Sequence, residues 1–263
     1  MPEPAHHGGR AAWRRTVLVA RHTLTIAFRL RLALLLGLTG AGLIAGSWEL
    51  QAFNFGQVEV KFLGDLGLGV IGWLGSLLAV LATTHLFFDA ISHGAAQMVL
   101  ARPIRRWEYV CGIHAGIAAL LAGFVALLSA VLAAVLVARG GAWPGEHLRL
   151  AVLLQAAAVA WLKLVLIAAM SLFVCSFAQS ALFASCASLM LVLVAQLRRF
   201  APEHGVGQWL RVWPDLGLLD PGEVLAGGRV AGIRWVAGIT LYWAAYVALF
   251  DALTSHVFHR REC

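Results

Sequence analysis

The sequence has 263 residues, of which 61% are hydrophobic and 13% are charged, and its mean hydropathy is +0.83. Soluble domains carry about twice this fraction of charged residues, so these values exclude a water-soluble globular fold. A net charge of +7 is compatible with a nucleic-acid partner. However, the basic residues concentrate at the ends of apolar segments, where they set orientation in a membrane. We therefore expect membrane lipid, and no nucleic acid, as a partner.

Long apolar segments follow one another along the chain. Each is about 20 residues long or longer, enough to cross a hydrocarbon core of roughly 30 Å as a helix. None alternates apolar with polar residues as a barrel strand would. The predicted fold is therefore an all-α membrane protein, a single transmembrane domain over residues 1–263 with six membrane-spanning helices. The predicted spans cover about residues 32–48, 68–88, 111–137, 150–174, 181–197 and 233–253.

The first predicted element, about residues 13–31, precedes these spans. It mixes arginines with apolar residues at helical spacing. This pattern is typical of an amphipathic helix that lies along the membrane surface, with its cations near the lipid headgroups. No short apolar stretch with a small-residue cleavage site comes before it, so we expect no cleavable signal peptide.

The segment between the second and third predicted spans combines an acidic residue, an amphipathic stretch and a basic turn. Pro103 disfavours the helical conformation for Arg102, so the amphipathic helix should end there. Arg105 and Arg106 hold the turn at the inner membrane surface, and the aromatic residues that follow anchor the third span at the headgroup level. We expect a rigid helical elbow on the cytoplasmic side.

Lys163 lies about midway along the fourth predicted span. An ionisable residue at this depth is costly in lipid and usually faces a cavity or a partner. Lys163 would then belong to a substrate path or to a subunit interface. Snorkelling toward the membrane surface, or a hydrogen bond to a carbonyl of another helix, explains it equally well. The sequence leaves these interpretations open.

The distribution of basic residues predicts the orientation. With the N-terminus inside, the arginines of the N-terminal segment, of the elbow and of the C-terminal tail all face the cytoplasm. They outnumber the basic residues of the opposite face. The positive-inside rule then places both termini in the cytoplasm.

No pattern typical of an active site or a metal site is present in the sequence. The 4 cysteines form no C-x-x-C pair. His22, His85 and His114 lie near the ends of predicted spans and could ligate haem, but no two of them have matched spacing on clearly facing spans. We expect no catalytic residue, metal or cofactor in this chain, and hence no enzymatic activity.

The order of residues in the elbow is more specific. It reads Asp89, Gly94, Val99-Leu100, Pro103-Ile104-Arg105-Arg106, Glu108 and Gly112. This order resembles a segment of ABC-2 type permeases, the membrane subunits of ATP-driven exporters, although Arg105 stands where that family commonly has serine. Three further segments look like the family's N-terminal interfacial helix, the segment before its last span and its basic ending. They are VLVARHTLTIAFRLR (17–31), WPDLGLLDPGEVLAGG (213–228) and FHRREC (258–263).

The resemblance implies that the chain is one half of a channel in a bacterial inner membrane. It would pair with a second copy of itself or with a homologous permease. It would also dock a separate cytoplasmic ABC ATPase subunit, which binds ATP and Mg²⁺. The sequence has no G-x-x-x-x-G-K-[ST] phosphate-binding loop, in agreement with a motor on another polypeptide. The implied docking surface is the coupling helix of the elbow, with Asp89, His93, Gln97, Arg102, Pro103, Arg105, Arg106 and Glu108.

Two other functions remain open at this point. One is a membrane-embedded redox or haem protein, and the other is a membrane assembly factor that transports nothing. The resemblance implies export but does not define the substrate. Because the sequence gives no sign of a charged cavity, we expect an amphiphilic or lipid-like cargo.

Overall fold

The computed structural model describes residues 8–28, 31–47, 49, 59–92, 106–140, 150–198, 213–222 and 231–260, and the regular secondary structure in these ranges is helical. Within these ranges there is no strand. The helices are α1 (Gly8–Phe28), α2 (Arg31–Gly46), α3 (Glu59–Ser92), α5 (Arg106–Gly140), α6 (Leu150–Phe177), α7 (Ala181–Leu197) and α10 (Ile233–Arg260). The predicted all-α class is confirmed for these residues.

Within these described ranges, four helices are each long and apolar enough to cross a membrane. Their apolar stretches are Phe62–Ala90, Trp107–Ala138, Leu150–Phe177 and Ile233–Val257. The predicted first and fifth spans coincide with α2 and α7, which are apolar but only 16 and 17 residues long. α1 and α2 pass the same test together as a pair bent by 66°, which would make a fifth span. The chain is therefore a multi-pass membrane protein. The described residues give four single-helix spans, or five with the bent pair, so the prediction of six spans is not confirmed.

Several helices extend well beyond the predicted spans. α3 begins at Glu59, nine residues before the second predicted span (68 − 59 = 9), and takes up part of the expected polar connection. α5 begins at Arg106, so it includes the end of the expected elbow. These helices are longer than the predicted spans because hydropathy marks only the part of a helix that lies in hydrocarbon. Backbone hydrogen bonds of a helix continue through polar residues at the membrane surface.

Hydroxyl groups inside the bundle bind to their own helices. Thr83 Oγ1 donates to the Ala79 carbonyl at 2.6 Å, and Ser171 Oγ donates to the Ile167 carbonyl at 2.8 Å. These bonds satisfy polar groups where no water is available. They allow the apolar helices to pack without leaving buried hydroxyls unpaired at these positions.

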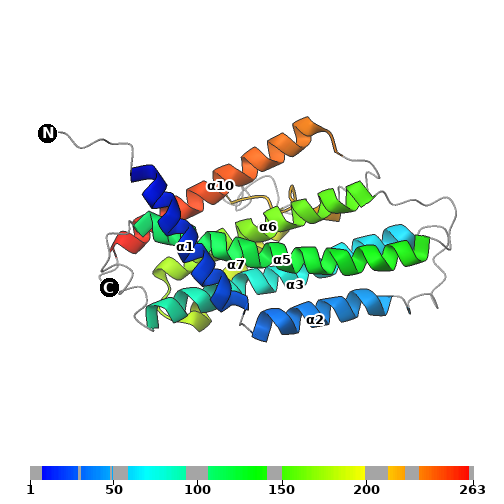
Figure 1. Ribbon diagram of the computed structural model, residues 1–263, viewed down its shortest axis with the longest axis horizontal. Helices are drawn as coiled ribbons and strands as arrows, with labels where there is room; N and C mark the ends of the chain where they lie inside the picture. Colours follow the sequence, from blue (N-terminus) through cyan, green and yellow to red (C-terminus); the bar gives the residue numbers. More distant parts are fainter. Residues whose placement is uncertain are drawn as a thin grey trace.

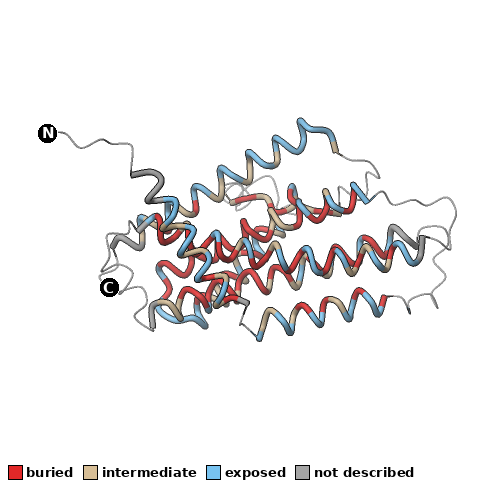
Figure 2. Tube along the Cα trace, viewed as in Figure 1, coloured by how far each residue is buried: buried red, intermediate tan, exposed pale blue. Residues whose placement is uncertain are grey.

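The helices form an elongated bundle with α6 near its centre and α10 at its edge (Figure 1). In the most apolar stretch of α6, 72% of the residues are buried, whereas in that of α10 only 11% are. Figure 2 shows the same contrast, with α10 exposed along most of its length. α1 packs mainly on α5, and α10 packs on α6 and α5. α10 is thus the least buried of the four spans.

One end of the bundle brings distant parts of the chain together. The start of α1, the end of α3, the start of α5 and the end of α10 all lie at this end, on the left in Figure 1. We call it the α1 end. α1 crosses the bundle there at an angle, instead of running parallel to the spans. The two helices that flank the predicted elbow therefore meet next to α1.

Candidate functional site

At the α1 end, two glycines of α5 bring it into close contact with α1. A Cβ atom on Gly116 would lie 2.7 Å from Thr23 Cβ and 2.8 Å from the Ala20 carbonyl oxygen. A Cβ atom on Gly112 would lie 2.7 Å from Val19 Cβ. Small residues four positions apart let two helix backbones approach this closely. We call this contact, with the ion pair described next, the α1–α5 seam.

A charged pair lies one turn before Gly112 on the same face of α5. Arg15 Nε donates to Glu108 Oε2 at 2.9 Å, and Arg15 Nη2 donates to Glu108 Oε1 at 3.1 Å. The Glu108 side chain is only 1% exposed, and that of Arg15 is 35% exposed. This two-point geometry fixes orientation as well as distance.

The predicted docking residues fall in different places. Asp89 lies half-buried near the end of α3, and Arg106 is the first residue of α5. Glu108 is buried against α1, so in the structure it belongs to the seam and not to an exposed surface. The others, His93, Gln97, Arg102, Pro103 and Arg105, lie outside the described residues. The structure therefore describes the two ends of the predicted elbow, at the end of α3 and the start of α5.

Lys163 lies at a cleft between α3, α6 and α7, closed on one side by the segment 213–222. The cleft has a volume of about 440 Å³. Asp65, Gln196 and Asp220 also line it, together with Trp73 and several glycines. A cleft of this size holds a small molecule or part of a lipid. It offers both signs of charge to a polar group, next to the apolar surface of the bundle.

Polar contacts hold the segment that closes the cleft. The backbone nitrogen of Asp215 donates to Tyr242 Oη of α10 at 2.6 Å, and Arg198 at the end of α7 donates to the Trp213 carbonyl. Asp220 Oδ1 accepts the backbone N–H of Gly222 at 3.1 Å, which shapes the turn beside the cleft. These bonds tie the segment to α7 and α10.

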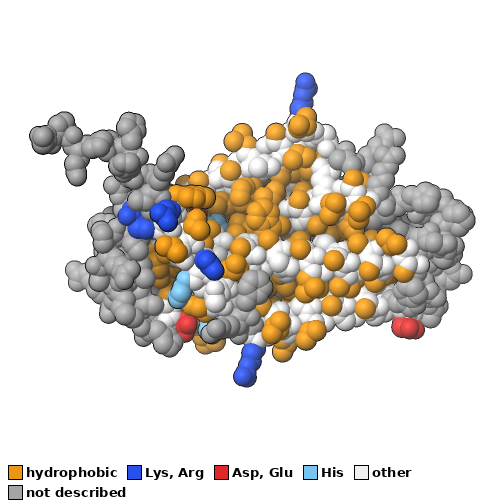
Figure 3. Space-filling model, viewed as in Figure 1, with side chains coloured by type: hydrophobic (Ala, Val, Ile, Leu, Met, Phe, Trp, Pro, Cys, Tyr) orange, Lys and Arg blue, Asp and Glu red, His pale blue; other side chains and the backbone are white. Residues whose placement is uncertain are grey.

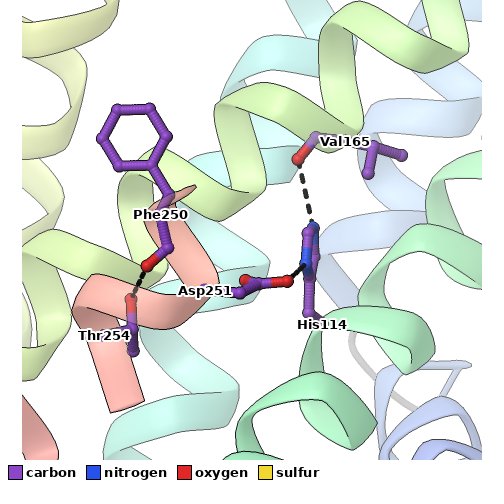
Figure 4. A network of polar contacts seen from close by, with 5 residues as sticks. All are labelled: His114, Val165, Phe250, Asp251 and Thr254. Carbon is purple, nitrogen blue, oxygen red and sulfur yellow. Dashed lines mark hydrogen bonds and ion pairs between the residues drawn. The ribbon is translucent and has the colours of Figure 1, made fainter. Parts of the chain in front are cut away.

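A second polar cluster lies between α5, α6 and α10 (Figure 4). His114 Nδ1 of α5 lies 2.8 Å from Asp251 Oδ2 of α10, and His114 Nε2 lies 3.3 Å from the Val165 carbonyl oxygen of α6. Thr254 Oγ1 donates to the Phe250 carbonyl at 2.8 Å, next to the pair. One histidine therefore connects three helices.

Sequence reasoning considered His114 only as a haem ligand and missed Asp251. The two residues are 137 positions apart, so no local motif joins them. The signal available was Asp251 itself, an acidic residue in an apolar stretch, to which the argument used for Lys163 applies equally. Among the side chains that the structure describes, no three histidine, cysteine, aspartate or glutamate residues lie together as a metal site would require.

The visible surface separates apolar from basic residues. Figure 3 shows hydrophobic side chains over the middle of the bundle, and Lys and Arg toward its margins, several of them over α1. This separation is expected of a surface that faces lipid between two charged headgroup layers. It agrees with membrane-spanning helices and gives the α1 end a basic character.

These features define an all-helical, multi-pass membrane protein that keeps small polar clusters between its helices. The sequence matches no model of a known protein family and no curated protein. A proposal about its function therefore depends on the contacts above and on the residue order of the elbow.

Proposed function

We propose that the chain is the permease subunit of an ATP-driven exporter of the ABC-2 type. It works as half of a channel with a second copy of itself or a homologous permease, in a bacterial inner membrane. A separate cytoplasmic ATPase subunit docks on the elbow and supplies the energy. The α1 end then faces the cytoplasm, with both termini inside. The basic side chains over α1 support this orientation, because the positive-inside rule favours it.

The α1–α5 seam is the observation that carries this proposal. Its close glycine contact and its two-point ion pair hold α1 firmly to the first turns of α5. These are the turns that directly follow the elbow. A displacement of the elbow by a nucleotide-driven partner would therefore move α1 and α5 together as one rigid unit. Transport by this class of mechanism requires such rigid-body movement of packed helices.

Reversing the charge of the elbow tests the docking surface. Arg105→Glu combined with Arg106→Glu should abolish co-purification of the ATPase subunit, because two cations become anions at the proposed contact. Candidate ABC ATPase subunits from the same genome are co-expressed with a tagged permease. The measurement is the amount of ATPase that co-purifies in detergent.

The matched control changes the same charge elsewhere. Arg139→Glu is combined with Arg149→Glu: Arg139 lies in the last turn of α5, and Arg149 directly precedes α6 in the sequence. This variant should retain the ATPase. If the elbow variant also binds the ATPase normally, the docking assignment is wrong. If the ATPase binds but no export occurs with any cargo, a non-transporting assembly factor is the better description.

The cleft at Lys163 is the proposed substrate path. The cleft carries charged side chains, contrary to the premise from which the amphiphilic cargo was expected. A cation, carboxylates and an apolar wall together still suit the charged head and the apolar tail of an amphiphile. Lys163→Gln should weaken stimulation of the reconstituted complex's ATPase activity by amphiphiles about tenfold or more, the effect of one lost charge-assisted hydrogen bond. Docking of the ATPase should not change.

Proteoliposomes that contain both subunits provide the assay, with single-chain and double-chain amphiphiles as probes. Arg234→Gln, at an exposed residue at the start of α10, is the matched control and should behave as wild type. Equal stimulation of the Lys163→Gln complex by every probe would remove the cleft from the transport path. Stimulation by strictly hydrophilic solutes alone would contradict an amphiphilic cargo.

A further inference from the structure

We infer that His114 and Asp251 form a proton-binding site inside the bundle, and that the bound proton holds α10 against α5 and α6. The site is distinct from the cleft at Lys163 and from the α1–α5 seam. It does not depend on the proposed function, because it rests on contacts of two side chains that ATPase docking does not involve.

The hydrogen-bond partners of His114 show where its protons lie. A carbonyl oxygen only accepts hydrogen bonds, so the 3.3 Å contact of Nε2 with the Val165 carbonyl requires a proton on Nε2. The 2.8 Å contact of Nδ1 with Asp251 Oδ2 requires a second proton, carried either by an imidazolium or by a carboxylic acid. In both arrangements the pair holds two protons and has no net charge.

Loss of either proton leaves one repulsive contact and a net negative charge. Without the proton between the two residues, a nitrogen lone pair faces a carboxylate; without the other, a lone pair faces the Val165 carbonyl. The side chains of His114 and Asp251 are only 7% and 15% exposed, so this charge would be largely buried. Asp251 Oδ1 is buried and has no hydrogen-bond partner among the described residues. A buried charge without a partner is costly.

The other titratable groups of the packed helices do not replace this proton. Cys111 on α5 lies near the carboxylate of the pair and carries no positive charge. Lys163 on α6 lines the cleft with α3 and α7. Glu108 lies toward α1, where Arg15 binds it. Arg14, Arg21 and His22 of α1, and Arg234 and His256 of α10, have exposed side chains. The proton is therefore the positive charge that balances the carboxylate.

α10 is the least buried of the four spans, with only 11% of its most apolar stretch buried. It packs on α6 and α5. One of its contacts lies at Phe250, whose ring packs against Phe173 and Trp213 with centroid distances of 5.9 Å and 6.5 Å. The proton-binding pair is adjacent to this aromatic contact. As pH rises through the value at which the pair releases its proton, α10 should loosen from α5 and α6.

The test follows the attachment of α10 as a function of pH. The full-length protein in nanodiscs of phosphatidylcholine and phosphatidylglycerol is measured by hydrogen exchange and mass spectrometry, from about pH 5 to about pH 9, with correction for the intrinsic pH dependence of exchange. In wild type, the protection of α10 around Phe250 should fall by about tenfold or more at the alkaline end. The protection of α6 should not change.

Asp251→Asn removes the ionisable carboxyl group but keeps the hydrogen bonds of the pair. The asparagine amide can donate to Nδ1 of a neutral histidine, while Nε2–H still donates to the Val165 carbonyl. α10 should therefore stay protected over the whole pH range. His256→Gln, at an exposed histidine of the same helix, should keep the wild-type pH dependence. The inference is overturned if Asp251→Asn follows the wild-type curve, or if wild type shows no change with pH.

A spectroscopic measurement on wild type covers the case in which the asparagine variant does not fold. Nitrogen NMR of histidine-labelled protein reports which ring nitrogens carry protons, with the resonance of His114 identified by its loss in His114→Gln. The expected state at neutral pH has a proton on Nε2. A neutral His114 with its proton on Nδ1 alone would contradict the proton-binding site.

Discussion

Replacing Gly116 by alanine should separate α1 from α5 and destabilise the protein. The new methyl group would lie 2.8 Å from the carbonyl oxygen of Ala20 and 2.7 Å from Thr23 Cβ. The carbonyl belongs to the backbone of α1, which cannot rotate away as the end of a flexible side chain can. The two helices must therefore move apart. Overpacking of this kind costs about 1–3 kcal/mol, and the apparent Tm of the purified protein should fall.

Gly42→Ala in α2 is the matched control for this substitution. A Cβ atom at Gly42 has no neighbour within 4 Å, so the methyl group adds no clash. Alanine also favours the helix over glycine by about 1 kcal/mol. The control should be as stable as wild type or slightly more stable. Equal Tm values for the two variants would show that the α1–α5 seam is not tightly packed.

Removing one partner of the Arg15–Glu108 pair should destabilise the protein more than removing both. Arg15→Met leaves the Glu108 carboxylate buried without its two hydrogen bonds. An unpaired buried charge is costly, whereas apolar residues of similar volume in place of a whole ion pair are often neutral or stabilising. The double variant Arg15→Met with Glu108→Met should therefore recover most of the loss in apparent Tm.

Arg14→Met provides the control, because Arg14 is an exposed cation on the same helix. It should have little effect, since isolated surface charges contribute little to stability. The expected order of apparent Tm is wild type and Arg14→Met highest, the double variant next and Arg15→Met lowest. A double variant as unstable as Arg15→Met would indicate that the pair contributes through its geometry and not through charge balance.

The sequence predicts the helical class of this fold well, because the signal is local. An apolar stretch of about 20 residues leaves the backbone no alternative to a helix in lipid. Helix ends are predicted less well. Glu59 and Arg106 begin helices outside the hydrophobic stretches, where polar side chains hide the continuation of the helix from hydropathy.

The candidate sites are predictable only where a single residue is unusual by itself. Lys163 stands out because it is a charge within an apolar segment, and the structure places it at a cleft. The roles of Glu108 and His114 depend on partners 93 and 137 positions away. Such pairs arise from the packing of whole helices, and no spacing rule within one segment reveals them.

The α1–α5 seam also has a consequence for how the protein is made. α1 leaves the ribosome before α5, and the carboxylate that pairs with its Arg15 lies 93 positions later in the chain. During synthesis, Arg15 therefore has no ion-pair partner in α5 until α5 has been made and inserted into the membrane. Nascent chains arrested before α5 emerges should leave this first helix open to proteases or to a chaperone, and longer ones should protect it.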